Sequence, residues 1–137
     1  MEVDLALLAD AATLDASGKL NILGVFDRVG GRGLPLQHPR MAMVLRFTAG
    51  LQEAGRHEVE IVLRDPDGEE VVRMDGEMHL APGGGATGGQ IRVPHILNMD
   101  GLVFPKAGGY GFDVRVDGEH HVTIPLVVTS APAGAEA

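Results

Sequence analysis

Three short motifs that end in glycine constrain the fold of this chain more than any other feature of its 137 residues. They read Asp-Ala-Ser-Gly at 15–18, Asp-Pro-Asp-Gly at 65–68 and Val-Asp-Gly at 116–118, each between segments rich in apolar and β-branched residues. A type I turn followed by glycine in the left-handed conformation closes a three-residue β-hairpin loop. The motifs therefore predict three Gly-bulged hairpins, which join 3–13 to 19–29, 56–64 to 69–80 and 110–115 to 119–128.

The loop length also predicts which residues face each other across two of these hairpins. In the first hairpin, Leu14 lies opposite Leu20. In the third, a three-residue loop places Arg115 opposite Glu119, and a two-residue loop would break the match between the apolar faces. The residues expected to meet on that face are Tyr110, Phe112 and Val114 with Ile124, Val122 and His120.

Two further segments have the alternation of strands. Residues 41–48 place Met41, Met43, Leu45 and Phe47 on one face, and residues 90–97 place Ile91, Val93 and Leu97 on one face. Pro94 and Pro125 lack the N–H that a strand donates to its neighbour, which indicates edge positions. Tyr110, which follows two glycines, is typical of the tyrosine corner of a β-sandwich.

These patterns predict an all-β fold, a two-sheet antiparallel sandwich of about eight strands that is either immunoglobulin-like or jelly-roll-like. Residues 1–129 form a single domain of sufficient size to bury a core without disulfides or metals. The glycine-rich segment 81–89 is predicted to be a flexible loop and residues 130–137 a flexible tail.

The balance of charges and the absence of cysteine exclude several classes of function. The chain has 11 Lys and Arg against 19 Asp and Glu, a formal net charge of −8. Nucleic-acid binders need the opposite balance to contact phosphates, so no nucleic-acid partner is expected. The chain has no cysteine, an acidic rather than basic start, and no apolar run of membrane-spanning length. We expect a cytoplasmic protein that does not bind membranes.

Few residues are suited to catalysis. The only serines are Ser17, in the first turn, and Ser130, near the end of the chain. The acidic segment 65–70 lacks the ligand spacing of a calcium loop, and the glycines of 83–89 lack the ending of a phosphate-binding loop. We predict that the protein is not an enzyme, with no catalytic residue, bound metal or cofactor.

The six histidines give the alternative hypothesis, a small-ligand or metal-binding β-barrel or cupin-like protein. His120 and His121 are adjacent, so in a regular strand they point to opposite faces. His57 and His95 share a face with apolar neighbours, which favours positions at the rim of the core. A metal site would require convergence among His57, His79, His95 and His120.

The first strand is apolar on both faces, so each face is expected to pack against another part of the protein or against a partner. One face carries Leu5 and Leu7, the other carries Leu8, and Asp10 is the only interruption. The core covers one face, and either the segment 29–40 or a second subunit covers the other. We expect a homodimer that uses Leu5, Leu7 and Leu8.

Four segments of the chain stand out together: Leu-Leu-Ala-Asp-Ala-Ala at 7–12, Gly-Lys-Leu-Asn-Ile-Leu-Gly-Val-Phe-Asp at 18–27, Leu-Arg-Phe at 45–47 and Asn-Met-Asp-Gly-Leu-Val-Phe-Pro at 98–105. With these segments the chain resembles an uncharacterised bacterial domain-of-unknown-function family of small all-β proteins. The resemblance implies a bacterial origin and a complete domain. It implies no activity, partner or site residue.

The leading hypothesis is a non-enzymatic cytoplasmic binding or interaction module with an unknown protein partner. A structural subunit of a larger bacterial assembly is a further alternative. Recognition residues tend to be polar groups on the loops of a rigid scaffold. The candidates are Asp27, Arg28 and Arg32 after the second strand, with Asn98 and Asp100 before Phe104.

Overall fold

The computed structural model describes residues 1–81, 86–87 and 89–130, which form strands joined by turns and one 3-10 turn. In chain order the elements are β1 (Glu2–Leu14), β2 (Leu20–Phe26), β3 (Arg28–Gly31), β4 (Leu36–Gly50), η1 (Leu51–Glu53), β5 (Gly55–Arg64), β6 (Glu70–Leu80), β7 (Ala86–Thr87), β8 (Gln90–Phe104), β9 (Gly108–Val116) and β10 (Glu119–Ser130). No helix in the described part of the chain has the length and apolar character needed to cross a membrane.

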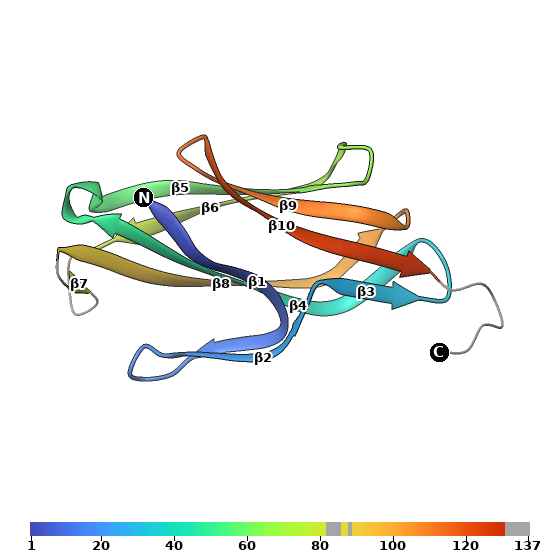
Figure 1. Cartoon of the computed structure of the whole chain (residues 1–137), viewed down its shortest axis with the longest axis horizontal. Coiled ribbons are helices and arrows are strands. Elements are labelled where there is room, and N and C mark those ends of the chain that lie inside the picture. Colours follow the sequence, from blue (N-terminus) through green and yellow to red (C-terminus); the bar gives the residue numbers. More distant parts are fainter. Residues whose placement is uncertain (82–85, 88, 131–137) are drawn as a thin grey trace.

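The strands form two sheets that face each other across the core (Figure 1). Sheet A has the order β2-β1-β4-β8-β7 and sheet B the order β3-β10-β9-β5-β6. Within the described ranges, neighbouring strands are antiparallel except β3 and β10, which are parallel. The predicted all-β sandwich is therefore confirmed, with one parallel pair that the sequence did not predict.

The strand order distinguishes between the two sandwich types that the sequence left open. The series β1-β4-β8-β7 and β10-β9-β5 reproduce the two sheets of the immunoglobulin fold. The tyrosine corner is also present: the Tyr110 hydroxyl donates to the Lys106 carbonyl at 2.8 Å and accepts the Lys106 N–H at 3.0 Å. The sandwich is immunoglobulin-like rather than jelly-roll-like.

The core lies between the sheets and uses the faces that the alternation predicted. Met41, Met43, Leu45 and Phe47 on β4 are completely buried, opposite a sheet B face that includes Leu63 and Phe112. Among the described residues, Pro94 lies where β8 has β4 on one side only, because β7 pairs no further than Gln90 and Ile91. Pro125 likewise precedes the part of β10 that pairs with β3. Both prolines occupy edge positions, as predicted.

The first two predicted hairpins have the expected loops. In the first, Asp15 N–H donates to Lys19 and Gly18 N–H to Asp15, both at 3.0 Å, and Gly18 has φ +85°. Leu14 pairs with Leu20, as predicted. The second loop repeats this pattern, with donation from Asp65 to Glu69 and a φ of +83° at Gly68. A short glycine-bulged turn is local, so the residues of the loop are enough to predict it.

The prediction for the third hairpin is wrong in its loop and its register. Val116 pairs with Glu119, and the loop contains only Asp117 and Gly118, at φ +51° and +82°. This is the two-residue loop with two positive φ angles that matches the twist of a hairpin. A bulge at His121 then adds one residue and returns the apolar side chains to the core face. The resulting pairs are Phe112 with Ile124 and Val114 with Val122.

The segments predicted to be flexible fall largely outside the described residues. Within 81–89, residues 86–87 form β7, and residues 82–85 and 88 lie outside the description. Of the predicted tail, Ser130 ends β10 and residues 131–137 lie outside it.

Candidate interaction surface

The first strand divides its apolar residues between the core and the outer face of sheet A. Leu8 pairs with Met43 and is 1% exposed, so it belongs to the core. Leu5 and Leu7 face outward and are half-buried. The expectation that Leu8 lines a dimer interface is therefore wrong, because the register with β4 turns its side chain inward.

The outer face of sheet A is apolar along its central rows. Leu7 on β1, Val44 on β4 and Ile96 on β8 lie side by side, and Ala9 pairs with Ala42 in the next row. The segment 29–40, one of the two expected covers for the first strand, instead forms β3 and the start of β4. No third layer of strands lies on this face within the described ranges. Ala9, Ala42 and Val44 are nonetheless 0% exposed, so of these five side chains Leu7 and Ile96 are the ones partly accessible.

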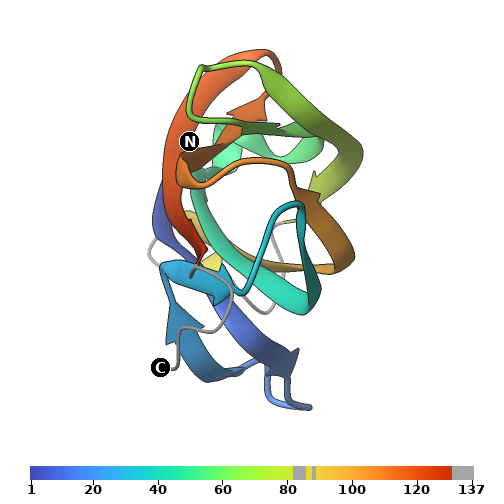
Figure 2. The same ribbon diagram turned by 90° about the vertical axis from the view of Figure 1, so that its right-hand side faces the viewer.

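The first hairpin extends beyond this face as an arm. Strand β1 pairs with β4 only as far as Ala9, whereas from Ala11 onward it pairs with β2 alone. We name residues 10–24 the β1–β2 arm. Figures 1 and 2 both show it projecting from the body of the sandwich. An isolated two-stranded hairpin is marginally stable in water, so such an arm favours a partner.

The arm and its base carry the two most exposed of the large apolar side chains described. Leu23 is 71% exposed and Val25 is 62% exposed, and both lie on the outward side of β2. Leu14, near the tip, is also exposed. Leu23 and Val25 continue the apolar outer face of sheet A from Leu7 onto the arm, whereas Leu14 lies on the opposite face of β1, the face of Leu8.

A polar notch of about 300 Å³ lies where the arm leaves the sandwich. Its walls are Asp10, Ala11 and Ala12 of the arm and Arg40, Asn98 and Asp100 of β4 and β8. Arg40 Nε lies 3.6 Å from Asp100 Oδ1. The structure thus brings together the predicted residues Asn98 and Asp100. It adds Asp10 and Arg40, which sequence reasoning missed because nothing in the sequence shows that β4 pairs with β8.

The other predicted residues lie elsewhere. Asp27 lines a separate hollow of about 290 Å³ with Phe26 and Pro125, and its carbonyl accepts the Val127 N–H at 2.9 Å. Arg28 lies on β3 and Arg32 follows that strand; both side chains are exposed. The structure does not unite Asp27, Arg28 and Arg32 with the notch.

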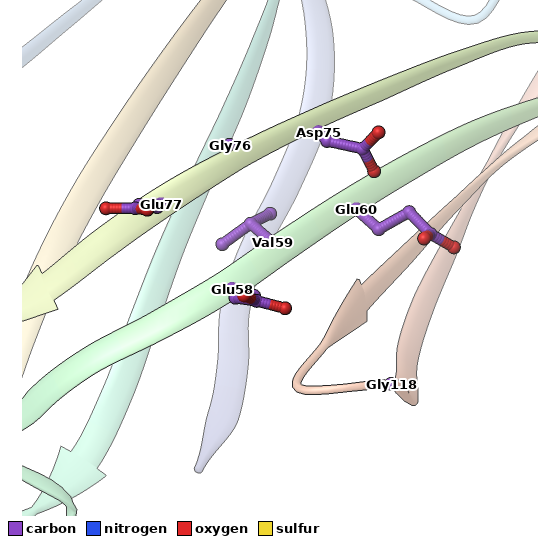
Figure 3. Close-up of a pocket in the computed structure, with 7 residues that line it drawn as sticks. All are labelled: Glu58, Val59, Glu60, Asp75, Gly76, Glu77 and Gly118. Carbon is purple, nitrogen blue, oxygen red and sulfur yellow. The ribbon is translucent and has the colours of Figure 1, made fainter.

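The outer face of sheet B is charged rather than apolar. A hollow of about 450 Å³ has Glu58 and Glu60 on β5 opposite Glu77 and Asp75 on β6 (Figure 3). Arginines neutralise part of this charge, with Arg56 2.7 Å from Glu77 and Arg73 2.7 Å from Glu60. Within the described residues, no three His, Cys, Asp or Glu side chains are placed to hold a metal ion. This face has the character of a solvated surface.

A hydrogen-bonded network beside this hollow connects three strands. Asp113 on β9 accepts from Thr123 on β10 at 2.6 Å and from Arg64 on β5 at 2.9 Å. His120 Nε2 lies 2.8 Å from the Thr123 hydroxyl. Burial raises the pKa of Asp113, but the Thr123 and Arg64 hydrogen bonds outweigh burial and lower it. No sequence pattern predicts this network, because its members become neighbours only when β5, β9 and β10 pair.

The four histidines of the alternative hypothesis make separate contacts. His79 pairs with Arg56 across β5 and β6, and His120 belongs to the network with Thr123. His95 is turned toward the core, where burial lowers its pKa. The convergence required for a metal site does not occur among the described residues.

His57 is held between two acceptors. Its Nδ1 lies 2.6 Å from Asp117 Oδ2 and its Nε2 lies 2.6 Å from the Glu53 carbonyl oxygen. Both partners can only accept, so the ring makes both hydrogen bonds when both nitrogens carry a proton. The Asp117 carboxylate and the Glu53 carbonyl accordingly raise the pKa of His57. His57 therefore connects β5 to the β9–β10 loop, and protonation of its ring allows both hydrogen bonds at once.

The fold and these surfaces define an immunoglobulin-like β-sandwich domain with one charged and one apolar outer face. The model of DUF6941, a family of unknown function, matches residues 4–129, and the chain belongs to this family. The resemblance to an uncharacterised family is thus confirmed. No curated protein matches the chain.

Proposed function

We propose that this domain is a non-enzymatic, cytoplasmic protein-interaction module that binds its partner through the β1–β2 arm and the adjoining outer face of sheet A. The observation that carries the proposal is the exposure of Leu23 on the arm and of Val25 at its base, where β1 leaves β4 and pairs with no other strand than β2 within the described part of the chain. Large exposed apolar side chains that continue an apolar sheet face are typical of interaction sites.

The magnitude of the hydrophobic effect supports this assignment. Complete burial of a leucine or valine side chain contributes roughly 1.5–3 kcal/mol, and both Leu23 and Val25 retain most of this contribution for a partner. The charged outer face of sheet B offers no comparable gain, because binding there would require its carboxylates and arginines to lose water. The apolar side of the molecule is therefore the better docking surface.

Cross-linked affinity purification from the organism that encodes the chain tests this proposal. The baits are the wild-type protein, Leu23→Glu and Val25→Glu, with Leu51→Glu as the matched control because Leu51 is an exposed leucine on η1. We expect the wild type and the control to capture the same partners and both arm variants to lose them. Identical captures by all four baits would contradict the assignment of the surface.

Circular dichroism of each bait distinguishes a loss of binding from a loss of folding. Leu23, Val25 and Leu51 are all exposed, so a glutamate at any of these positions is expected to leave the fold intact. A wild-type bait that captures nothing above background would contradict the proposed function itself.

A further inference from the structure

The arm has the features needed to bind a second copy of this chain, an inference that rests on the proposed function. We propose that two copies pair through the free edge of β1, residues 10–14, antiparallel about a two-fold axis at Ala12. The two arms then form one continuous sheet in the order β2, β1, the partner's β1 and the partner's β2. Such an isologous contact closes on itself and gives a dimer.

The free edge of β1 presents hydrogen-bonding groups in the correct row. Asp15 and Lys19 form a hydrogen-bonded pair at the loop, and residues 14 to 11 of β1 pair with β2 in one register. The same register resumes at Ala9, beyond Asp10 and Gly24, which form no ladder pair. In an antiparallel ladder, alternate residues direct their N–H and C=O groups to the same neighbour. The groups of Asp10, Ala12 and Leu14 therefore point away from β2, toward an edge that no described strand occupies.

Residues 10–14 carry little that would prevent another strand from pairing with this edge. Sheet edges are normally protected by lysine, proline, a bulge, short length or several charges, and this segment has one charge, on Asp10. Edge strand β6 carries alternating charges that include Arg73 and Asp75, and edge strand β3 is only 4 residues long. The outer edge of β2 is interrupted at Gly24, which has φ +71°. The β1 edge is therefore better suited to strand pairing than the edges of β6, β3 and β2.

The two-fold register matches donors to acceptors and small side chains to small side chains. Ala12 lies opposite the partner's Ala12, and Asp10 lies opposite the partner's Leu14, so the outward-pointing backbone groups of the two edges meet. Ala11 lies opposite the partner's Thr13, which leaves no bulky or like-charged pair in the row. Both arms then gain a third and fourth strand, which supplies the support that an isolated hairpin lacks.

The same register brings the tip of each arm to the polar notch of the other copy. Beyond the partner's Leu14, its loop reaches the point where β1 joins β4, which is the position of the notch. The tip carries one acid, Asp15, and one base, Lys19. The notch carries Arg40 to receive the acid and Asp100 to receive the base. This complementarity occurs twice in the dimer and identifies a second copy as the partner.

Cysteine cross-linking tests this pairing directly, because the native chain has no cysteine. Directly opposite, hydrogen-bonded residues in an antiparallel pair have Cα atoms about 5.5 Å apart, within the range of about 4.4–6.8 Å for a disulfide. Ala12→Cys is therefore expected to form a covalent dimer under mild oxidation. Leu51→Cys provides the control, since Leu51 is exposed on η1.

The rates of the two reactions decide the outcome. Pairing raises the effective thiol concentration from roughly micromolar to roughly millimolar, so we expect Ala12→Cys to cross-link at least about tenfold faster than Leu51→Cys. Equal rates would overturn the proposed pairing.

Sedimentation of variants without cysteine supplies an independent test. Ala12→Pro removes the N–H that points to the free edge while leaving the pairing with β2, and Ala12→Ser retains that N–H. We expect the wild type and Ala12→Ser to sediment as dimers and Ala12→Pro as a folded monomer. A dimeric Ala12→Pro would contradict the assigned edge.

The failure of this inference differs from the failure of the proposed function. A wild-type protein that remains monomeric at about millimolar concentration, but still loses a captured partner on Leu23→Glu, would overturn only the pairing between copies. A wild-type protein that stays monomeric and whose captured partners are unaffected by Leu23→Glu would overturn the interaction surface as a whole.

Discussion

Deprotonation of His57 is expected to weaken the fold as the pH rises above neutrality. Below the ordinary histidine pKa of 6.5, the ring donates both to Asp117 and to the Glu53 carbonyl. These partners raise the folded-state pKa, so the stabilisation is complete below 6.5 and is lost as the pH rises through the raised value. The free energy of unfolding should therefore fall with increasing pH in this range.

The geometry sets the size of the effect. Neutral imidazole has one N–H, so one of the two acceptors loses its hydrogen bond when the proton leaves. A hydrogen bond to a charged group contributes about 1.5–3 kcal/mol, and the Asp117 side chain is 53% exposed, so water replaces part of the interaction. We expect a loss of about 1 kcal/mol, and a single proton limits the slope to roughly 1.4 kcal/mol per pH unit.

Urea unfolding between about pH 5.5 and 9 measures this contribution. His57→Gln should show a flatter dependence on pH than the wild type, so the difference between their free energies isolates His57 from the other histidines. Asp117→Asn is the matched variant. Asparagine tolerates the positive φ of +51° and still accepts the Glu58 N–H, but it removes the carboxylate whose hydrogen bond most raises the pKa of His57. Parallel curves for wild type and His57→Gln would refute the reasoning.

Three further predictions concern the stability of the sandwich. Tyr110→Phe removes both hydrogen bonds to Lys106 and should lower the free energy of unfolding by about 1–3 kcal/mol in urea; an unchanged midpoint would mean that the corner contributes nothing. Gly24→Ala should cost about 1–2 kcal/mol, because Gly24 has φ +71° and a Cβ there would lie 2.3 Å from Asp10 Oδ2; a rise in thermal midpoint would contradict this. Phe112→Ala should cost about 3–5 kcal/mol, since the ring is completely buried, and Phe112→Leu should cost less; equal losses would argue against a cavity as the cause.

Local chemistry accounts for the parts of the fold that were predicted correctly. The turns at 15–18 and 65–68 contain all the residues that determine their geometry, and the alternation at 41–48 requires one buried face in any sandwich. The same reasoning gave a wrong loop length and register for the third hairpin. Its two-residue loop and the bulge at His121 each reverse the sidedness of the strand, so the apolar pattern alone cannot reveal that both are present.

The candidate surface was predictable only in part. Asn98 and Asp100 were identified as polar residues near a strand end, but Arg40 and Asp10 join them through the pairing of β4 with β8 and the path of β1. Leu8 was expected at an interface because a strand that is apolar on both faces does not show which face meets the core. The register with Met43 decided that question.

The sequence by itself determined that this chain forms a β-sandwich with a continuous apolar core and without a basic surface or reactive cysteine. Composition, alternation and turn chemistry are properties of neighbouring residues, so they are present before the chain folds. Only the tertiary structure decided that β1 leaves β4 after Ala9 and continues as an arm with an open edge. A strand's partners lie far away in the sequence, and the hydrogen bonds that a strand edge leaves unmade become evident only when the whole sheet is assembled.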